Sequence, residues 1–278
     1  MMDKIESFGN STFQHGKHNN RVYLMSLEDQ DVPTIVPFLD DLASDEGYTK
    51  IFAKVPSSAA APFLANGYRT EANIPGFFNG KEETLFLGKY HCPDRLQEKK
   101  ADLVQDVIET AQAKQGTLRD AGLDSSLVCR RTEAKDAEQM VELYRQVFAS
   151  YPFPIHDPAY LAETMESHVI YYGIWDDSDL IALASAEMDR DKANAEMTDF
   201  ATRPDCRGKG LANTLLSTLE EAAEAEGIKT AYTIARSYSM GMNITFAKHD
   251  YSFSGTLTNN TNISGGLESM NVWHKPLV

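Results

Sequence analysis

Apolar positions along the chain recur with two different spacings, one typical of strands and one typical of helices. The clearest helical spacing lies within residues 203–227, where one apolar stripe is formed by Leu211, Leu215, Leu216, Leu219 and Ala223. This stripe predicts an amphipathic helix with one buried face. Gly227 follows it where a C-terminal cap is expected. The first turn of the predicted helix carries no acidic residue, so its electropositive end lacks a counter-charge.

The second half of the chain reads as an α/β unit. From residue 126 onward the patterns predict a strand, a helix, three strands, a helix, a strand, a helix and a closing strand, in that order. The segment YPFPIHDP, residues 151–158, is predicted to be a stiff loop because proline fixes the backbone there. This order allows both antiparallel and parallel neighbours, so we expect a mixed central sheet with helices on both faces.

Strand-like and helix-like segments also alternate over residues 21–90, and they end in a predicted hairpin. Residues 93–122 are rich in charge and carry a narrow apolar stripe, which predicts a connecting helix. A length of 278 residues is comfortable for two domains. We therefore expect an N-terminal domain over residues 1–122, including the connecting helix, and a second domain over residues 123–278.

A faint internal echo links the two halves. The stretch that begins at Lys50 and the stretch that begins at Lys229 both read as strand, small-residue turn, short helix, aromatic residue and loop. The gap lengths differ between the two stretches. The alternatives are a degenerate structural repeat and a coincidence.

Composition narrows the class of protein. The net charge of −15 argues against nucleic acid or an anionic membrane as partner, since both require basic faces. The three cysteines form no CxxC pair, and His15 and His18 lie near no acid or cysteine, so we expect no metal site. The chain shows no apolar run of membrane-spanning length and no signal peptide at its start. We therefore expect a cytoplasmic protein.

The turn before the helix of residues 211–225 is a candidate anion site. Free N–H groups and the positive end of the helix dipole attract an anion, and Gly208 and Gly210 let it approach the backbone. Arg207 and Lys209 add positive charge. The alternative is an ordinary glycine-containing loop with a solvated basic pair. Neither GxxxxGK[ST] nor GxGxxG occurs in the chain.

The combination of a strand, an Arg-x-x-Gly-x-Ala pattern at Arg207, Gly210 and Ala212, and a leucine-rich helix resembles the acetyl-CoA signature of the GNAT superfamily of N-acetyltransferases. The element order of residues 126–278 is similar to the GNAT fold. The resemblance implies acetyl-CoA as co-substrate. It also implies that the pyrophosphate of coenzyme A is held by the backbone of Arg207, Gly208, Lys209, Gly210, Leu211 and Ala212. In the second cofactor segment, Asn243 becomes a candidate contact for the pantetheine arm.

A narrower resemblance covers nearly the whole chain. The stretches YPFPIHDPAY, EMTDFATRPDCRGKGLA, ARSYSMGMN and SMNVWHK, with YTKIFAKVP in the N-terminal extension, are similar to the beta-lysine N6-acetyltransferases. These enzymes make a compatible solute. The resemblance implies that the acceptor is the terminal ammonium of 3,6-diaminohexanoate. The faint internal echo, together with the absence of an Arg-x-x-Gly-x-Gly/Ala pattern in the first 120 residues, predicts that these residues form a non-catalytic, GNAT-like half packed on the catalytic domain. The sequence leaves the oligomeric state open, with a homodimer as one alternative.

Acetyl transfer to an amine requires a base, because an alkylammonium with a pKa near ~10.4 must first lose a proton. Glu196 and Asp199 are the carboxylates available in the strand before the glycines, and Glu196 aligns with the base of related enzymes. Strict alternation places the two on opposite faces, so both can serve only if a bulge intervenes. Backbone N–H groups of Phe200, Ala201 and Thr202 are expected to contact the thioester oxygen.

One departure from the GNAT pattern concerns the proton donor for the leaving thiolate. Phe246 stands where many relatives carry a tyrosine, and it cannot donate a proton. Tyr238, Tyr251 or a water molecule are the substitutes that the sequence leaves open.

A diamine that carries a carboxylate needs acids for its ammonium groups and a cation for its carboxylate. For these tasks the candidates are Glu187, Asp199 and Arg236. As a lid or wall of the pocket we single out Tyr151, Phe153 and His156. Besides small-diamine acetylation, two functions remain open. One is acetylation of a protein or peptide amine, and the other is a coenzyme A-binding sensor without catalysis.

Overall fold

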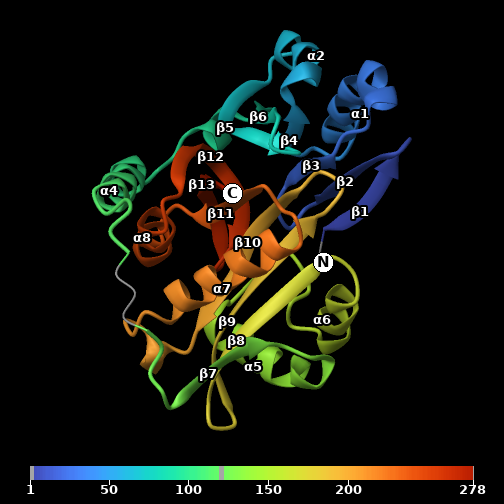
Figure 1. Cartoon of the computed structure of the whole chain (residues 1–278). Coiled ribbons are helices and arrows are strands. Elements are labelled where there is room, and N and C mark those ends of the chain that lie inside the picture. Colours follow the sequence, from blue (N-terminus) through green and yellow to red (C-terminus); the bar gives the residue numbers. More distant parts are fainter. Residues whose placement is uncertain (1–2, 119–121, 278) are drawn as a thin grey trace.

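The computed structural model describes residues 3–118 and 122–277, and their strands form one continuous sheet (Figure 1). The order of its thirteen strands is β1-β2-β3-β4-β6-β5-β12-β13-β11-β10-β9-β8-β7. The N-terminal half therefore occupies one side of the sheet and the C-terminal half the other, and they meet where β5 pairs with β12. Within the described residues, no helix combines the length and hydrophobicity needed to span a membrane.

The N-terminal half comprises β1 (Lys4–Phe8), β2 (Ser11–Gly16), β3 (Arg21–Ser26), α1 (Val32–Asp45), β4 (Lys50–Pro56), α2 (Ala61–Ala65), β5 (Arg69–Phe78), β6 (Glu82–Tyr90), α3 (Pro93–Leu96) and α4 (Ala101–Gln112). The C-terminal half comprises β7 (Leu127–Arg131), α5 (Ala137–Val147), α6 (Pro158–Met165), β8 (Val169–Asp176), β9 (Asp179–Asp189), β10 (Asn194–Thr202), α7 (Leu211–Ala225), β11 (Thr230–Arg236), α8 (Met240–Lys248), β12 (Ser252–Ile263) and β13 (Gly266–Pro276). Short 3₁₀ turns cover Asp29–Asp31, Ser57–Ala59, Ala134–Asp136 and Pro204–Cys206.

The two halves repeat one topology. In the N-terminal half, β3 leads through α1 to the parallel strand β4, and α2 follows before the hairpin β5–β6, in the spatial order β4-β6-β5. In the C-terminal half, β10 leads through α7 to the parallel strand β11, and α8 follows before β12–β13, in the order β11-β13-β12. The two stretches of the sequence echo occupy equivalent elements, β4-α2-β5 and β11-α8-β12. This correspondence supports a repeat over a coincidence.

The helices cover the sheet in separate groups. On the N-terminal half, α1 and α2 bury one face of β3 and β4, with Val22, Leu24, Ile51 and Ala53 in the core. On the C-terminal half, α7 and α8 pack on one face and α5 and α6 on the other. The mixed sheet with helices on both faces is confirmed. The side chains of β3 and β4 that point away from α1 and α2, among them Tyr23 and Phe52, face the C-terminal half.

Several elements differ from the sequence-based expectation. The predicted connecting helix of residues 93–122 is two helices, α3 and α4, and ends at Gln112; residues 119–121 lie outside the described residues. α4 packs against α8, and its Ala111 belongs to the core of the C-terminal half. The sequence reading missed β1, β2, α6 and β12. The last is polar and asparagine-rich, and pairing with β13 and β5 makes it a strand.

Candidate active site

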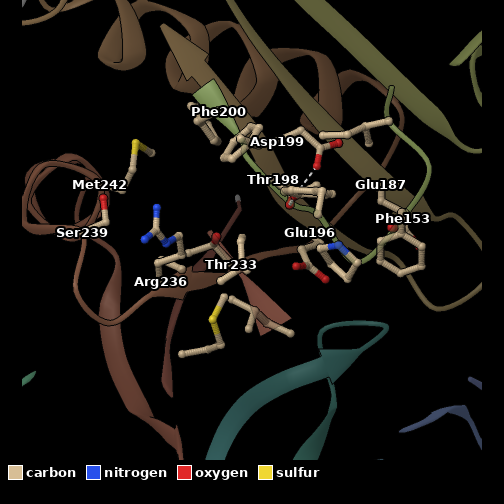
Figure 2. Close-up of a pocket in the computed structure, with 18 of the residues that line it drawn as sticks. Phe153, Glu187, Glu196, Thr198, Asp199, Phe200, Thr233, Arg236, Ser239 and Met242 are labelled. Carbon is tan, nitrogen blue, oxygen red and sulfur yellow. Dashed lines mark hydrogen bonds between the residues drawn. The ribbon is translucent and has the colours of Figure 1, made fainter. Parts of the chain in front are cut away.

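A cavity of about 1010 Å³ lies between the two halves. β10, β11, the start of α7 and α8 line it from the C-terminal half, together with the segment of residues 147–155 and α6. β3 and β4 line it from the N-terminal half. Figure 2 shows the acids Glu187, Glu196 and Asp199 gathered with Phe153 at one end, while Arg236, Ser239 and Met242 lie at the other.

The cavity opens where β10 and β11 separate. Their parallel pairing covers only three residue pairs and ends with Glu196 opposite Tyr232, although both strands continue beyond this point. Beyond this point both strands line the cavity. β10 contributes Thr198, Phe200 and Thr202, and β11 contributes Ile234 and Arg236. A parallel pair that diverges exposes main-chain groups that a sheet normally satisfies, and a substrate can use them.

A bulge in β10 brings Asp199 to the same side as Glu196. The pairing of β10 with β9 shifts between Thr198 and Ala201, and Asp199 adopts a left-handed backbone with φ of 57°. Aspartate tolerates this region better than most residues. Without the shift, alternation would direct Asp199 toward α7, as it directs Met197. The bulge is the condition under which the sequence allowed both acids to act, and the structure contains it.

Glu187 and Glu196 are direct cross-strand partners on β9 and β10. Burial raises the pKa of Glu196 to about 8, and the charge of Glu187 adds to this, while Lys54 and a hydrogen bond with Tyr232 oppose it. The pKa of Glu187 is lowered. Burial by itself would raise this pKa, but the hydrogen bond with His168 and the charge of Lys54 outweigh the effect of burial. One carboxyl of the pair is therefore ionised at neutral pH and the other holds a proton.

Asp199 is held by hydroxyl groups. Tyr151 donates to one carboxylate oxygen, and Ser185 Oγ donates to the other at 2.6 Å. Burial still raises the pKa of Asp199, despite these donors. Because both oxygens are engaged and the orientation is fixed, Asp199 is better placed to anchor a cation than to collect a proton.

The start of α7 forms an anion cradle. Gly208 and Gly210 both have positive φ, at 80° and 79°, and Gly210 is the N-cap residue. No side chain caps the helix, and its first turn carries no acid. A Cβ on Gly208 would meet no protein atom within 4 Å, so the space above it is open to a ligand. Arg207, Gly208, Gly210, Leu211 and Ala212 line the cavity here, whereas Lys209 does not. The cradle fits a pyrophosphate.

Phe246 lines the cavity from α8 and stacks edge-on against Phe200, with ring centroids 5.5 Å apart. Neither tyrosine named as its substitute lines the cavity. Tyr238 donates to Glu98 at 2.7 Å, and Tyr251 is fully buried behind Phe246. Of the three alternatives for the thiolate's proton donor, the structure leaves water.

Three predicted contacts need correction. Asn243 is fully buried and does not line the cavity: its amide donates to the carbonyls of Arg236 and Ser239 and accepts from Trp273. His156 also lies outside the cavity lining, while Tyr151 and Phe153 belong to it. Arg236 lines the cavity, but Glu268 neutralises it with contacts of 2.8 and 3.0 Å. It is therefore not a free cation for a substrate carboxylate.

The sequence reading missed the contribution of the N-terminal half. Arg21, Tyr23, Phe52 and Lys54 line the cavity, and the charges of Glu187 and Glu196 act on Tyr23. Lys54 lies 3.4 Å from the hydroxyl of Tyr232 and bears on Glu187 and Glu196. No local motif marks these residues, because they reach the site through alternation on β3 and β4 and through the packing of the two halves.

A sheet that splays beside a glycine-containing helix start, with acids at the splay, defines an enzyme of the GNAT type. The model of the "Acetyltransferase (GNAT) family" matches residues 137–242. The chain is 35% identical over 274 residues to a beta-lysine N(6)-acetyltransferase of Methanococcus maripaludis, with 99% of each chain covered. It is 31% identical over 280 residues to the N-acetyltransferase YodP of Bacillus subtilis, with 100% of each covered.

A beta-lysine N(6)-acetyltransferase of Methanosarcina mazei is 41% identical over 142 residues, which are 51% of this chain and 52% of that one. The chain belongs to the GNAT family of acetyltransferases. It is an N-acetyltransferase that uses acetyl-CoA.

Proposed function

We propose that the protein transfers the acetyl group of acetyl-CoA to the terminal amine of beta-lysine. The observation that carries this proposal is the grouping of Glu187, Glu196 and Asp199 at one end of the cavity between the two halves. Such an end favours an acceptor with two ammonium groups. Full-length similarity to a relative named for this reaction supports the same acceptor. The product carries one positive and one negative charge and is neutral, as suits a compatible solute.

The cofactor end of the site holds coenzyme A. The α7 cradle, with Gly208 and Gly210, seats the pyrophosphate, and Arg207 adds charge beside it. Acetyl-CoA supplies the thioester that the amine attacks. The main chain of Asp199 and Phe200 has no cross-strand partner in β9 or β11, so its N–H groups are our candidates to contact the thioester oxygen.

Glu196 is our candidate for the general base. Its pKa of about 8 is close to working pH, where a base both accepts a proton readily and is partly ionised. Tyr232 lies beside it on the neighbouring strand β11, and the charge of Lys54 acts on it from β4 of the N-terminal half. We assign Asp199 to anchor an ammonium group, together with Glu187 on the neighbouring strand.

A protein or peptide acceptor is the first alternative, and a coenzyme A-binding sensor is the second. A peptide acceptor needs an open groove, but β3 and β4 cover the acid-rich end of this cavity. Phe246 in place of a tyrosine is the feature that favours a sensor.

The test is acetyl-CoA turnover with beta-lysine, α-lysine and lysine-containing peptides, with the acetylated position read by NMR. We expect turnover with beta-lysine, acetylation of its terminal nitrogen and no turnover with peptides. Turnover with peptides alone would establish the first alternative. Tight coenzyme A binding without acetylation of any amine would establish the sensor.

A further inference from the structure

Arg21 is a buried arginine with unused hydrogen-bonding capacity. It lies on β3, is only 4% exposed and lines the cavity. Nη1 donates to the carbonyl oxygen of Asn260 at 2.7 Å and contacts Thr261 Oγ1 at 3.2 Å. Nε is buried without a partner. A guanidinium offers five donors in a fixed fork, so this one retains the capacity to bind an anion.

No carboxylate of residues 3–118 or 122–277 forms an ion pair with Arg21. Asp3 influences it electrostatically, but the oxygens of Asp3 accept from the backbone of His18 and from Asn19. Burial lowers the pKa of Arg21 to about 10, as expected for a cation removed from water without a counter-charge. A buried charge is normally paired, so the missing partner indicates a ligand.

Arg95 provides an internal comparison. It is also buried and is absent from the ion pairs among the described residues, but it does not line the cavity. Its Nε, Nη1 and Nη2 all donate, to acceptors on Asn259, Thr49, Asn20 and Asn19. Arg95 is therefore satisfied by the fold, whereas Arg21 is not.

The other cationic side chains that line the cavity are either engaged by other residues or belong to other elements. Arg236 is paired with Glu268, and Lys54 lies among the acids beside Tyr232. Arg207 and Lys248 belong to the start of α7 and the end of α8, away from β3. Arg21 is the cation that replaces Arg236 as a candidate for a substrate carboxylate.

The cavity therefore has two poles. Arg21 and Tyr23 are two residues apart on β3 and point to the same side, and the guanidinium lies 5.1 Å from the Tyr23 ring centroid. Tyr23 stacks on Phe52 at 4.6 Å and feels the charges of Glu196 and Glu187 as well as that of Arg21. An aromatic platform thus separates a cation from a group of acids. A molecule with a carboxylate at one end and an ammonium at the other matches this order.

We propose that Arg21 binds the carboxylate of the acceptor, so that the N-terminal half selects amino acids over simple amines. This role rests on the proposed acetylation of an amine in this cavity. The N-terminal half would then be a specificity element: Arg21 orients the acceptor, and its far amine faces Glu196.

The test compares two acceptors in the wild type and in Arg21→Gln. Beta-lysine carries the carboxylate, and 1,4-diaminopentane is the same molecule without it. For Arg21→Gln we expect the KM for beta-lysine to rise ~10- to 100-fold, the usual worth of a charge-assisted contact, with kcat little changed. Both constants for 1,4-diaminopentane should stay within about twofold of the wild type. Calorimetric binding of beta-lysine in the presence of coenzyme A should weaken by the same factor as the KM.

Two further variants separate the contact from a structural effect. Arg21→Lys keeps the charge and should recover part of the affinity for beta-lysine, and the exposed Arg69→Gln should resemble the wild type. Equal losses for both acceptors in Arg21→Gln, or unchanged binding of beta-lysine, would overturn the assignment. If wild type acetylates only amines that lack a carboxylate, both this role and the beta-lysine proposal are wrong. If the wild type acetylates another amino acid instead, only the proposal of beta-lysine as the acceptor is wrong. The same comparison, made with that amino acid and its decarboxylated form, then decides the role of Arg21.

Discussion

Glu187 and Glu196 face each other across the antiparallel strands β9 and β10, as direct cross-strand partners. Like charges in this arrangement are destabilising, and a protein retains them where a ligand or a proton compensates. Here burial and the charge of Glu187 raise the pKa of Glu196 to about 8, while His168 and Lys54 keep Glu187 ionised. A cationic acceptor that enters between them relieves the repulsion and meets a base of suitable strength.

Glu196→Gln should lower kcat by ~10²–10⁴, the usual worth of general base catalysis, while the affinity for coenzyme A is retained. The loss should shrink as the pH rises, because more of the acceptor is then already a free amine. Steady-state kinetics over about pH 6 to 9 measures both effects. Glu221→Gln, an exposed change on α7, is the matched control. Equal turnover in Glu196→Gln and wild type across this range would remove Glu196 from the mechanism.

The raised pKa of Glu196 also predicts how the stability of the free enzyme depends on pH. The folded state holds the proton up to about pH 8, whereas an unfolded glutamate loses it near ~4.3. The stability that this proton contributes is therefore complete below the unfolded pKa and is lost as the pH rises through about 8. Glu196→Gln should accordingly gain in melting temperature relative to wild type at alkaline pH and show little gain at acidic pH. A difference that does not change with pH would contradict the shift.

Asp199→Asn should raise the KM for the diamine ~10-fold or more and affect kcat less, because it removes an anchoring charge. Tyr151→Phe removes one hydroxyl that donates to Asp199 and should cause a smaller change in the same direction. Kinetics with beta-lysine at saturating acetyl-CoA separates the two constants. A large loss of kcat in Asp199→Asn, with none in Glu196→Gln, would transfer the role of base to Asp199.

Gly210→Glu should abolish coenzyme A binding, since it places a carboxylate and its bulk at the α7 cradle. Gly210 has φ of 79°, so any side chain there strains the backbone by about 1–2 kcal/mol. Gly210→Ala carries this strain without the charge and is the matched control. Calorimetry should find weakened coenzyme A binding in Gly210→Ala and no detectable coenzyme A binding in Gly210→Glu. The melting temperatures of the two variants should be similar. Unchanged coenzyme A affinity in a folded Gly210→Glu would refute the cradle assignment.

The local features of the cofactor end could be read from the sequence. Helix α7 lies within the predicted segment, and Gly227 follows it with φ of 82°. Gly208 and Gly210 have the positive φ that makes glycine useful at an anion site. These properties depend on residues a few positions apart, and periodicity and backbone sterics report on such neighbours directly.

The acceptor end was only partly accessible to sequence reasoning. Alternation correctly posed the problem of Glu196 and Asp199, and it named a bulge as the solution. It did not show that β10 contains one, because a bulge depends on the register with β9. The prediction that Asn243 contacts the cofactor was wrong, because its side-chain amide donates to backbone carbonyls of the preceding turn and accepts from Trp273, which lies 30 residues further along the chain.

The sequence by itself thus determined the fold class and the family and supplied the candidate seat for coenzyme A, all of which follow from short-range patterns and from motif resemblance. Only the tertiary structure decided which cation faces the acceptor. Arg236 carries the expected charge, but β13 brings Glu268 to neutralise it. Arg21 lies in a strand that carries no recognisable motif. It lines the cavity because the two halves form one sheet, in which both β3 and β10 contribute residues to the cavity wall. The physical reason is that a side chain's free charge depends on every group packed around it, and those groups come from parts of the chain whose pairing no local pattern records.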